Sequence, residues 1–434
     1  MSIHTRVLVV HQNFPGQFGH LVRTWAQRPG WDVRAFGRDI APGLPGFDRL
    51  LRYTPARTGR ADQHPYLRQM EAATLHGQAT ARAMMVLRKG GWVPDVIVAH
   101  PGWGETLYAK DVFPNARLVH LCEWYYTAQG ADLGFDPEFP VSFDARARIR
   151  TWNALHTLNL TNCDAAVAPT HWQKSRHPDI FQSKISVQHE GIATHELGPD
   201  EDATVTTPSG VVLRAGDVDR PVITYVARNL EPYRGFHIFM RALERIQRIE
   251  PRCHALIVGG DDVSYGQRPQ RARGNSGASR TWREHMLQQV KLDPTRIHFM
   301  GHLPRDQYLR VLQVSDAHVY LTYPFVLSWS LLEAMACGAP IVASDTAPVR
   351  EVMRDGVNGR LVGFFDVDAI AEAAASTMRS KSANVRLRMQ AMADVQRYGL
   401  TSAVAGYDDL LGLTSESANW ASLHNKLMMG EVVR

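Results

Sequence analysis

The sequence predicts an α/β protein with two doubly wound domains, each built around a parallel β-sheet. Its 434 residues are more than one hydrophobic core usually holds, so two domains are the natural expectation. Short apolar runs alternate with helical patterns and end at polar loops, which is typical of a parallel sheet with helices on both faces. This pattern stops in the breaker-rich segment 196–220 and then begins again.

The first half contains five apolar runs that we expect to be buried strands. The first is Val7–Val10, and a loop with Pro15 and Gly16 leads from it into a helix that carries Trp25. The other runs are 95–100, 117–122, 164–169 and 185–187. Polar residues follow most of these runs, so we expect functional side chains at the carboxyl ends of the strands.

The second half repeats this organisation. Its apolar runs are 222–226, 255–260, 297–299, 317–321 and 341–344, and 236–249 has the period of an amphipathic helix. The polar, Gly/Arg-rich stretch 261–283 is expected to be a mobile loop, either functional or simply disordered. The predicted organisation is an N-terminal domain over 1–200, a linker over 201–220, a C-terminal domain over 221–400, and a helical segment over 401–434 that can pack back on the N-terminal domain.

Composition indicates a soluble globular protein and argues against several other classes. Hydrophobic residues make up 44% of the chain and charged residues 21%. The four cysteines form no C-x-x-C pair, so neither a disulfide framework nor a zinc site is expected. The apolar run near the N-terminus is too short for a signal peptide or a membrane span. These features fit a reducing cytoplasm.

The net charge of +5 and the isoelectric point near 9.0 leave three interpretations open. The excess of basic residues can attract an anionic donor, hold the protein peripherally at the inner surface of a membrane, or belong to an ordinary solvated exterior. The sequence has no basic-aromatic stripe, so no nucleic acid partner is expected. Of three Asp-x-Asp motifs, two fall at the predicted linker and Asp366 of the third reads as a helix N-cap, so no metal is predicted.

Residues 328–356 are the most informative part of the sequence. An apolar helix begins with Ser328, Trp329 and Ser330, carries Glu333 one turn in, and ends at a Cys-Gly-Ala-Pro run. Free backbone amides at the start of such a helix suit a phosphate, and an acid one turn inside can reach a ribose. This segment therefore has the chemistry of a nucleotide site.

The run from Leu331 to Asp345, followed by Arg350–Val352 and Asp355–Gly359, closely resembles the donor-site signature of family-four glycosyltransferases, the group 1 glycosyltransferases. The resemblance implies the GT-B fold, in which two Rossmann-like domains with parallel sheets face each other across a cleft. It also implies a retaining hexosyltransferase that moves a sugar from a nucleoside diphosphate sugar, with a UDP-sugar favoured, to an acceptor hydroxyl. The acceptor is expected to be a glycan, a lipid-linked sugar or a small molecule, and no cofactor is expected beyond this co-substrate.

Arg228 and Arg234 bracket a tight loop after the first strand of the second half. Arginine suits phosphate because its planar guanidinium can bind two oxygens at once, so this pair could converge on one pyrophosphate. Two ordinary surface charges are the alternative. The family has an Arg and a Lys in this loop, which neutralise the donor's diphosphate. The resemblance therefore assigns Arg228 and Arg234 to donor binding and catalysis, with Arg234 in place of the lysine.

Phe325 is the main departure from the family pattern, in which seven residues separate two glutamates. Counting back from Glu333 places Phe325 where the first acid, which lies near the donor sugar, is expected. Either another group holds the sugar, which we favour, or the protein has lost catalysis and scaffolds an active partner while binding a nucleotide sugar. An epimerase or phosphorylase of the same fold is a further alternative, although no lysine is suitably placed for a phosphorylase's pyridoxal group.

Candidates in the first half lie at strand ends. Gly16 occupies the loop where the family brings its backbone close to the donor, and glycine permits such an approach, although a turn without a ligand explains it equally well. Glu123 ends the strand where many relatives place a histidine beside the sugar, so we assign it to acceptor orientation or deprotonation, with a solvated loop residue as the alternative. The remaining acceptor-side candidates are His100, Glu105, Trp124 and Tyr125, of which the aromatics can equally close the core.

Overall fold

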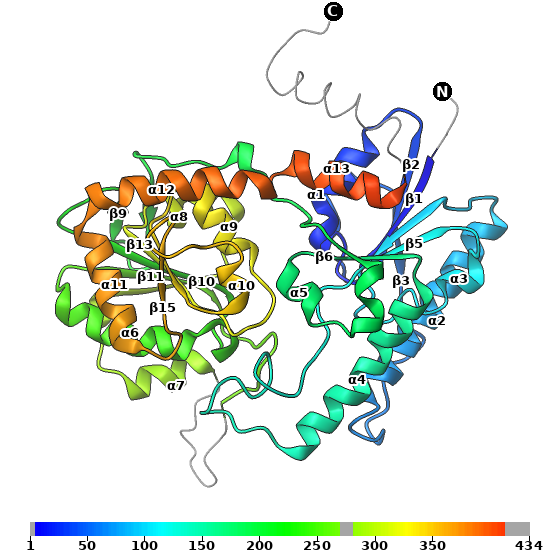
Figure 1. Cartoon of the computed structure of the whole chain (residues 1–434), viewed down its shortest axis with the longest axis horizontal. Helices are drawn as coiled ribbons and strands as arrows, with labels where there is room; N and C mark the ends of the chain where they lie inside the picture. The colour runs from blue at the N-terminus through cyan, green and yellow to red at the C-terminus, as the bar shows by residue number, and fades with distance from the viewer. Residues whose placement is uncertain (1–4, 270–280, 413–434) are drawn as a thin grey trace, which may run out of the picture. The chain divides into compact units, whose positions relative to one another are not determined.

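The computed structural model of the chain describes residues 5–269 and 281–412. They form two compact units, unit 1 (Met1–Ile192 with Tyr398–Arg434) and unit 2 (Ala193–Arg397). Each unit is an α/β assembly around a parallel sheet (Figure 1), so the predicted fold class is confirmed.

Unit 1 has a seven-stranded parallel sheet with the order β3-β2-β1-β4-β5-β6-β7. Its strands are β1 (Thr5–Val10), β2 (Trp31–Arg38), β3 (Leu50–Tyr53), β4 (Val96–Ala99), β5 (Arg117–Leu121), β6 (Ala165–Ala168) and β7 (Ile185–Val187). Its helices are α1 (Gly19–Ala26), α2 (Arg68–Lys89), α3 (Ala109–Val112), α4 (Phe143–Asn162), α5 (His171–Ser175) and α13 (Leu400–Leu411). Alternate residues of β1 face opposite sides: Val7 and Val9 pack in the core with α1 and α13, and Leu8 and Val10 in the core with α2 and α4.

A buried ion pair holds helix α13 on unit 1. The guanidinium of Arg28 donates from Nη1 to Asp408 Oδ1 at 2.9 Å and from Nη2 to Oδ2 at 2.6 Å, and the indole of Trp25 donates to Oδ1 at 3.1 Å. Tyr407 and Leu411 are buried in the same core. The start of the segment predicted to be helical over 401–434 therefore packs on unit 1, while residues 413–434 lie outside the described part of the chain.

Unit 2 has a six-stranded parallel sheet with the order β12-β11-β10-β13-β14-β15. Its strands are β10 (Val222–Asn229), β11 (His254–Gly260), β12 (Ile297–Gly301), β13 (Ala317–Tyr320), β14 (Ile341–Ser344) and β15 (Arg360–Val362). Its helices are α6 (Phe236–Ile249), α7 (Trp282–Gln289), α8 (Arg305–Gln313), α9 (Trp329–Ala336), α10 (Ala347–Arg350), α11 (Val367–Arg379) and α12 (Lys381–Val395). The predicted N-cap is confirmed, since Asp366 Oδ1 accepts the Ala369 N–H at 2.9 Å.

The segment predicted as a linker, 201–220, is folded. Strands β8 (Thr204–Thr206) and β9 (Val212–Arg214) form an antiparallel pair within unit 2. Val205 and Leu213 point into a core shared with Val222 and Leu256 of the main sheet. The sequence does not predict these two strands, because each has only three residues and turn-forming residues surround them. The division between the two units falls between Ile192 and Ala193, before the segment predicted as a linker. Of the stretch predicted to be mobile, 261–283, residues 270–280 lie outside the described part of the chain.

The strand order reverses at one point in each sheet, between β1 and β4 in unit 1 and between β10 and β13 in unit 2. Chains diverge to opposite faces at such a point, which leaves a crevice beyond the carboxyl ends of the two strands. Ligands of doubly wound sheets bind in this crevice, so these two edges are where functional residues are expected.

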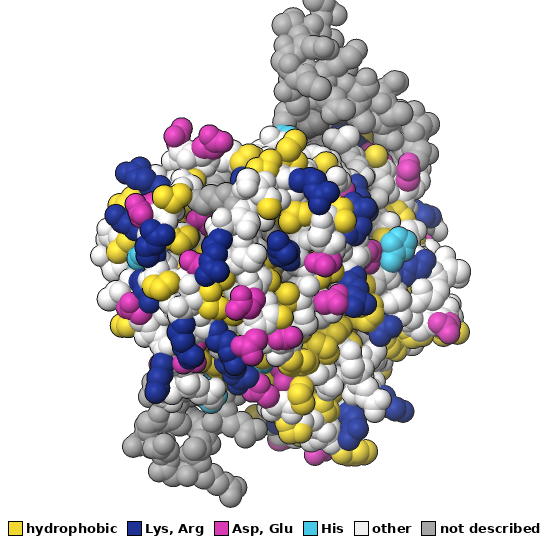
Figure 2. Space-filling view, turned by 60° about the vertical axis from the view of Figure 1, so that its left-hand side comes forward, with side chains coloured by type: hydrophobic (Ala, Val, Ile, Leu, Met, Phe, Trp, Pro, Cys, Tyr) yellow, Lys and Arg dark blue, Asp and Glu magenta, His cyan; other side chains and the backbone are white. Residues whose placement is uncertain are grey.

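The face of the molecule in Figure 2 carries Lys and Arg side chains interspersed with Asp and Glu. The positive net charge is therefore not gathered into one basic area on this face. Among the described residues, the helices lack the length and apolarity that a membrane crossing requires.

Candidate functional site

A cavity lies at the carboxyl edge of the unit 2 sheet, at its reversal point between β10 and β13. Four of the residues assigned to donor binding from the sequence line it: Arg228, Arg234, Ser328 and Ser330. The other lining residues are Val226, Ala227, Asn229, Glu231, Tyr265 and Tyr320. Three separate segments of the chain thus meet at one place.

Arg234 holds a fixed position in this cavity. Its Nη1 donates to Thr322 Oγ1 and to the Val326 carbonyl, both at 2.9 Å, and its guanidinium lies 5.6 Å from the ring centre of Tyr265. Burial works against its charge, but the neighbouring tyrosines and Glu231 outweigh burial and raise the pKa of Arg234. The side chain is therefore a permanent, oriented positive charge.

Arg228 and Asn229 end strand β10 on the same cavity. Arg228 is exposed, so its guanidinium is open to a ligand from solvent. Asn229 is 9% exposed and donates from Nδ2 to Ser264 Oγ at 2.8 Å. Its Oδ1 is buried without a hydrogen-bond partner in the described part of the chain, so one acceptor of this cavity residue remains unsatisfied.

Helix α9 begins at the cavity wall. Ser328 is its N-cap, and its Oγ accepts the Ser330 N–H at 3.3 Å while its own N–H donates to the Tyr320 hydroxyl at 2.9 Å. The two serine hydroxyls and the positive end of the helix therefore face the same space as the two arginines. This combination of donors is suited to a phosphate group.

Glu333 and Trp329 do not line the cavity. The buried carboxylate of Glu333 accepts from Arg305 Nη1 at 2.9 Å and from the Tyr308 hydroxyl at 2.7 Å, both from helix α8. Burial raises the pKa of Tyr308, and the neighbouring Glu333 carboxylate raises it further, so the phenol keeps its proton and stays a donor. Each carboxylate oxygen keeps a further lone pair, and the assignment of Glu333 to a ribose stays a prediction.

Phe325 is 3% exposed and lies behind the cavity wall instead of lining it. Its ring packs edge-on against Tyr265 at 4.9 Å and Tyr233 at 5.7 Å between ring centres. The acid of the cavity lining is Glu231, which is 1% exposed. An aromatic cluster thus occupies the position of the family's first glutamate, and the carboxylate in the cavity lining comes from another loop.

A polar cluster lies at the carboxyl edge of the unit 1 sheet, where β1, β4 and β5 end. Its centre is Glu123, whose Oε1 accepts from Gln17 Nε2 at 3.2 Å and whose Oε2 lies 3.4 Å from His100 Nε2. The Oε1 of Gln17 in turn lies 2.8 Å from His11 Nε2. Two histidines therefore connect to one carboxylate, one directly and one through an amide.

Backbone amides fix the tautomers of both histidines. The Asn13 N–H donates to His11 Nδ1 at 3.0 Å, and the Gly102 N–H donates to His100 Nδ1 at 3.2 Å. A ring nitrogen that accepts carries no hydrogen, so in each neutral ring the proton is assigned to Nε2. His11 then donates to Gln17, and His100 donates to the carboxylate.

These donors keep Glu123 ionised. Burial raises its pKa, but the hydrogen bonds from His100 and Gln17 oppose burial, and the pKa of Glu123 lies below its usual value. Its side chain is 32% exposed and open to a ligand. Gly16, at φ +50°, has a structural role here, because a Cβ at this position would lie 2.2 Å from His11 Nε2.

The other acceptor-side candidates divide into open and buried residues. His100 joins Glu123, and Trp103 stacks on its ring at 4.4 Å. Glu105 is 1% exposed; its Oε1 accepts from the Tyr53 hydroxyl at 2.6 Å, its Oε2 has no partner in the described part of the chain, and burial raises its pKa.

Trp124 is 5% exposed, and Tyr125 packs beside His156 and His177. Direct contact of Glu105 or Trp124 with an acceptor is therefore not supported.

The sequence does not single out several residues of these sites, among them His11, Gln17, Asn229, Glu231, Tyr265 and Tyr320. His11 carried a usable signal, because it directly follows strand β1 just as His100 follows β4. Glu231 lies between the two arginines, but nothing in the sequence shows that its partners come from residues 264–266.

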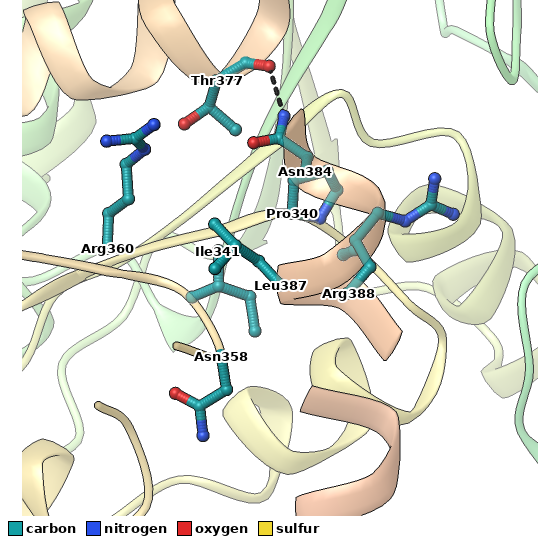
Figure 3. A pocket seen from close by; sticks show the side chains of 9 residues that line it. Pro340, Ile341, Asn358, Arg360, Thr377, Asn384, Leu387 and Arg388 are labelled. Atoms are coloured by element: carbon teal, nitrogen blue, oxygen red, sulfur yellow. Dashed lines mark hydrogen bonds between the residues drawn. The ribbon is translucent and has the colours of Figure 1, made fainter. Parts of the chain in front are cut away.

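A second, shallow hollow lies at the other edge of the unit 2 sheet, where β14 and β15 begin. Figure 3 shows the bond from Asn384 to the Thr377 carbonyl at 2.6 Å, with the Arg388 guanidinium turned away from the other labelled side chains. The hollow shares no lining residue with the cavity at the carboxyl edge. Its lining residues are Ala339, Pro340, Ile341, Asn358, Arg360, Thr377, Asn384, Leu387 and Arg388.

Comparison with protein families gives a match to each unit. The model described as glycosyl transferase family 4 group matches residues 29–197, and the model described as glycosyl transferases group 1 matches residues 215–394. The second match contains every residue that lines the cavity at the carboxyl edge of unit 2.

Similar proteins include the GDP-mannose-dependent alpha-(1-6)-phosphatidylinositol monomannoside mannosyltransferase of Mycolicibacterium smegmatis, which is 28% identical over 216 residues, or 49% of this chain and 52% of that protein. The chain thus spans about half the length of this curated relative. Sucrose-phosphate synthase from Thermosynechococcus elongatus has a similar structure, with a TM-score of 0.68 and 19% identity over 94% of this chain and 98% of that one. The structure of Anabaena HepE in complex with UDP-glucose is also similar, with a TM-score of 0.63 and 15% identity over 94% of this chain and 100% of that one. At these identities the structures show a shared fold.

Proposed function

The chain belongs to the group 1 glycosyltransferases and has their GT-B fold, and from this premise we propose that it transfers a sugar from a nucleoside diphosphate sugar to an acceptor hydroxyl with retention of anomeric configuration. The observation that carries the proposal is the cavity at the reversal point of unit 2, where Arg228, Arg234 and the start of helix α9 face one space. Two positive charges and a helix N-terminus are suited to a diphosphate.

In this reaction the bond between the anomeric carbon and the diphosphate oxygen breaks, and its electron pair stays on the diphosphate. The acceptor oxygen bonds to the anomeric carbon and gives up its proton. Negative charge grows on the diphosphate as its bond breaks, so Arg228 and Arg234 stabilise the transition state more than the bound donor. The leaving phosphate can take the acceptor's proton, so this route requires no carboxylate nucleophile.

Glu123 is proposed as the acceptor-side group of unit 1. It is ionised, partly exposed and held in place by Gln17 and His100. A carboxylate of this kind can accept a hydrogen bond from the reacting hydroxyl and orient it. The proposed reaction requires no metal ion.

Glu333 is proposed to accept hydrogen bonds from the donor's ribose, through the lone pairs that Arg305 and Tyr308 leave open.

The donor's base and the acceptor are chosen from the comparisons and the sequence together. The sequence favours a UDP-sugar, and the printed names of similar proteins include one GDP-mannose-dependent enzyme and one complex with UDP-glucose. The name of the GDP-mannose-dependent relative gives phosphatidylinositol monomannoside as its acceptor. A lipid-linked acceptor, reached by peripheral contact with a membrane, is therefore one acceptor class to test.

A catalytically inactive nucleotide-sugar-binding subunit is the second candidate. Phe325 favours it, because this buried ring replaces the acid that the family places near the donor sugar. The two candidates differ in turnover and not in donor binding. Slow hydrolysis of the donor in the absence of acceptor would identify the enzyme, whereas tight binding without release of nucleotide would identify the scaffold.

The experiment is to incubate the purified protein with UDP-, GDP- and ADP-sugars and measure nucleoside diphosphate release, with and without glycan and lipid acceptors. The proposal predicts release with one class of donor, increased by acceptor, and an NMR spectrum in which the product keeps the donor's anomeric configuration. Affinity for none of these donors would refute the proposed function, and an inverted product would refute retention.

A further inference from the structure

The carboxylate of Glu231 is the negative charge in the lining of the unit 2 cavity, beside the two arginines. It accepts hydrogen bonds from three successive backbone N–H groups. Ser264 donates to Oε1 at 3.1 Å and to Oε2 at 3.2 Å, and Tyr265 and Gly266 donate to Oε2 at 3.1 and 3.0 Å. A carboxylate offers about four lone-pair sites, so this loop uses most of the capacity of Glu231.

The loop is tied to strand β10 a second time. Asn229 Nδ2 donates to Ser264 Oγ at 2.8 Å. Asn229 and Glu231 therefore both hold the segment 264–266. Three adjacent amides that converge on one anion form a concave nest, a geometry that a neutral side chain fills poorly. The loop position therefore depends on the charge at residue 231.

Tyr265 is the part of this loop that faces the cavity. It is 39% exposed, its ring centre is 5.6 Å from the Arg234 guanidinium, and the rings of Tyr265 and Phe325 pack edge-on with 4.9 Å between their centres. Without the bonds to Glu231, the backbone of Tyr265 would lose the contacts that hold this ring against Arg234. The acid controls the cavity wall through the loop.

We propose that Glu231 is a positioning residue of the donor site, which holds the Ser264–Gly266 loop so that Tyr265 forms the cavity wall beside Arg234. The function of the wall rests on the proposed donor site. The contact with the loop does not, because it exists without a ligand. The acid that restrains the donor pocket is thus Glu231, between Arg228 and Arg234. It is not at position 325, where the family places its first glutamate.

Glu231→Gln separates this proposal from simple electrostatics by the sign of its effect. Glutamine removes a negative charge close to the arginines, which alone would tighten the binding of a diphosphate. Loss of the loop contact would instead weaken it. We expect about tenfold weaker binding of UDP or GDP by calorimetry, a similar loss in Tyr265→Ala, and little further loss in the double variant, because both changes remove the same wall.

Hydrogen exchange of residues 262–268 in the ligand-free protein tests the loop contact independently of any donor. Glu231→Gln should speed exchange about tenfold or more, whereas Glu372→Gln, at an exposed position of α11, should leave it unchanged. Glu231→Asp keeps the charge on a shorter side chain and should fall between the wild type and Glu231→Gln.

Unchanged exchange in Glu231→Gln would overturn the loop contact. Faster exchange with unchanged or tighter diphosphate binding, or additive losses in the double variant, would overturn its role in the donor site. If the wild-type protein bound no nucleoside diphosphate, the proposed function would fail, and exchange would still decide the loop contact.

Discussion

Replacement of Glu333 by glutamine tests whether the most family-like segment of the sequence binds a ribose. In the ligand-free structure both carboxylate oxygens already accept a hydrogen bond, from Arg305 and from Tyr308. These two donors orient the carboxylate, and ribose hydroxyls would add to them as further donors. Glutamine keeps the shape but loses the charge and one acceptor oxygen.

The structure predicts different magnitudes for affinity and stability. A hydrogen bond to a charged group contributes roughly 1.5–3 kcal/mol, so Glu333→Gln should weaken both donor and free nucleoside diphosphate by about 10- to 150-fold. The Arg305 side chain is 47% exposed, and an ion pair this open to water is worth at most about 1 kcal/mol. The free energy of unfolding should therefore change little while the affinity falls by one to two decades.

Calorimetric titration with the nucleoside diphosphate, paired with urea unfolding, measures both quantities. Arg305→Gln is the matched control, because it removes the ion pair but leaves the carboxylate, and we expect it to lower affinity by less than about threefold. If Glu333→Gln kept wild-type affinity, or if Arg305→Gln lost as much affinity as Glu333→Gln, Glu333 would be a structural partner of α8 and the ribose would lie elsewhere.

Three further predictions follow from buried or ionised carboxylates. Asp408→Asn leaves the buried Arg28 guanidinium without its counter-charge and should destabilise unit 1 by about 3–5 kcal/mol in urea unfolding, whereas Asp409→Asn, at the exposed neighbouring position, should change stability by less than about 0.5 kcal/mol. Burial raises the pKa of Glu105 in the folded protein above its usual 4.5, which penalises folding above that pH, so Glu105→Gln should raise the melting temperature at pH 7 and lose this advantage below pH 4.5; a constant difference across pH would contradict it. Because the pKa of Glu123 lies below its usual 4.5, the turnover of the wild type should not decline through loss of this carboxylate as the pH falls from 7 to about 5.5, and Glu123→Gln should reduce turnover about tenfold or more with unchanged donor affinity; equal turnover would remove Glu123 from the acceptor site.

The sequence predicts best the strands whose two faces are both apolar and buried. Strands buried on both sides, such as Val7–Val10 and Ile341–Ser344, read as uninterrupted apolar runs, and both were located. Strand β2 was not, because Asp32 and Arg34 interrupt its apolar residues. In the fold, Asp32 accepts from Arg34, Arg49 and the Trp92 indole, which compensates its charge with partners from distant segments.

The candidate sites show the same limit. The arginines and serines of the unit 2 cavity were identified because the donor segment carries a family signature within a short window of sequence. Glu231 depends on amides about thirty residues away, and Gln17 meets Glu123 across 106 positions. Such contacts arise from strand order and loop packing, and the sequence of either partner alone does not contain them.

The central claim is that the two arginines of unit 2 bind the diphosphate of a donor, and calorimetry with paired ligands tests it most directly. Wild-type protein and the Arg228→Ala/Arg234→Ala variant are titrated with UDP and uridine, and with GDP and guanosine. Arg252→Ala, an exposed arginine before strand β11, serves as the control for loss of charge. We expect the wild type and the control to prefer the diphosphate over the nucleoside by about tenfold or more, and the double variant to lose this preference. A preference retained in the double variant, or absent from the wild type, would contradict it.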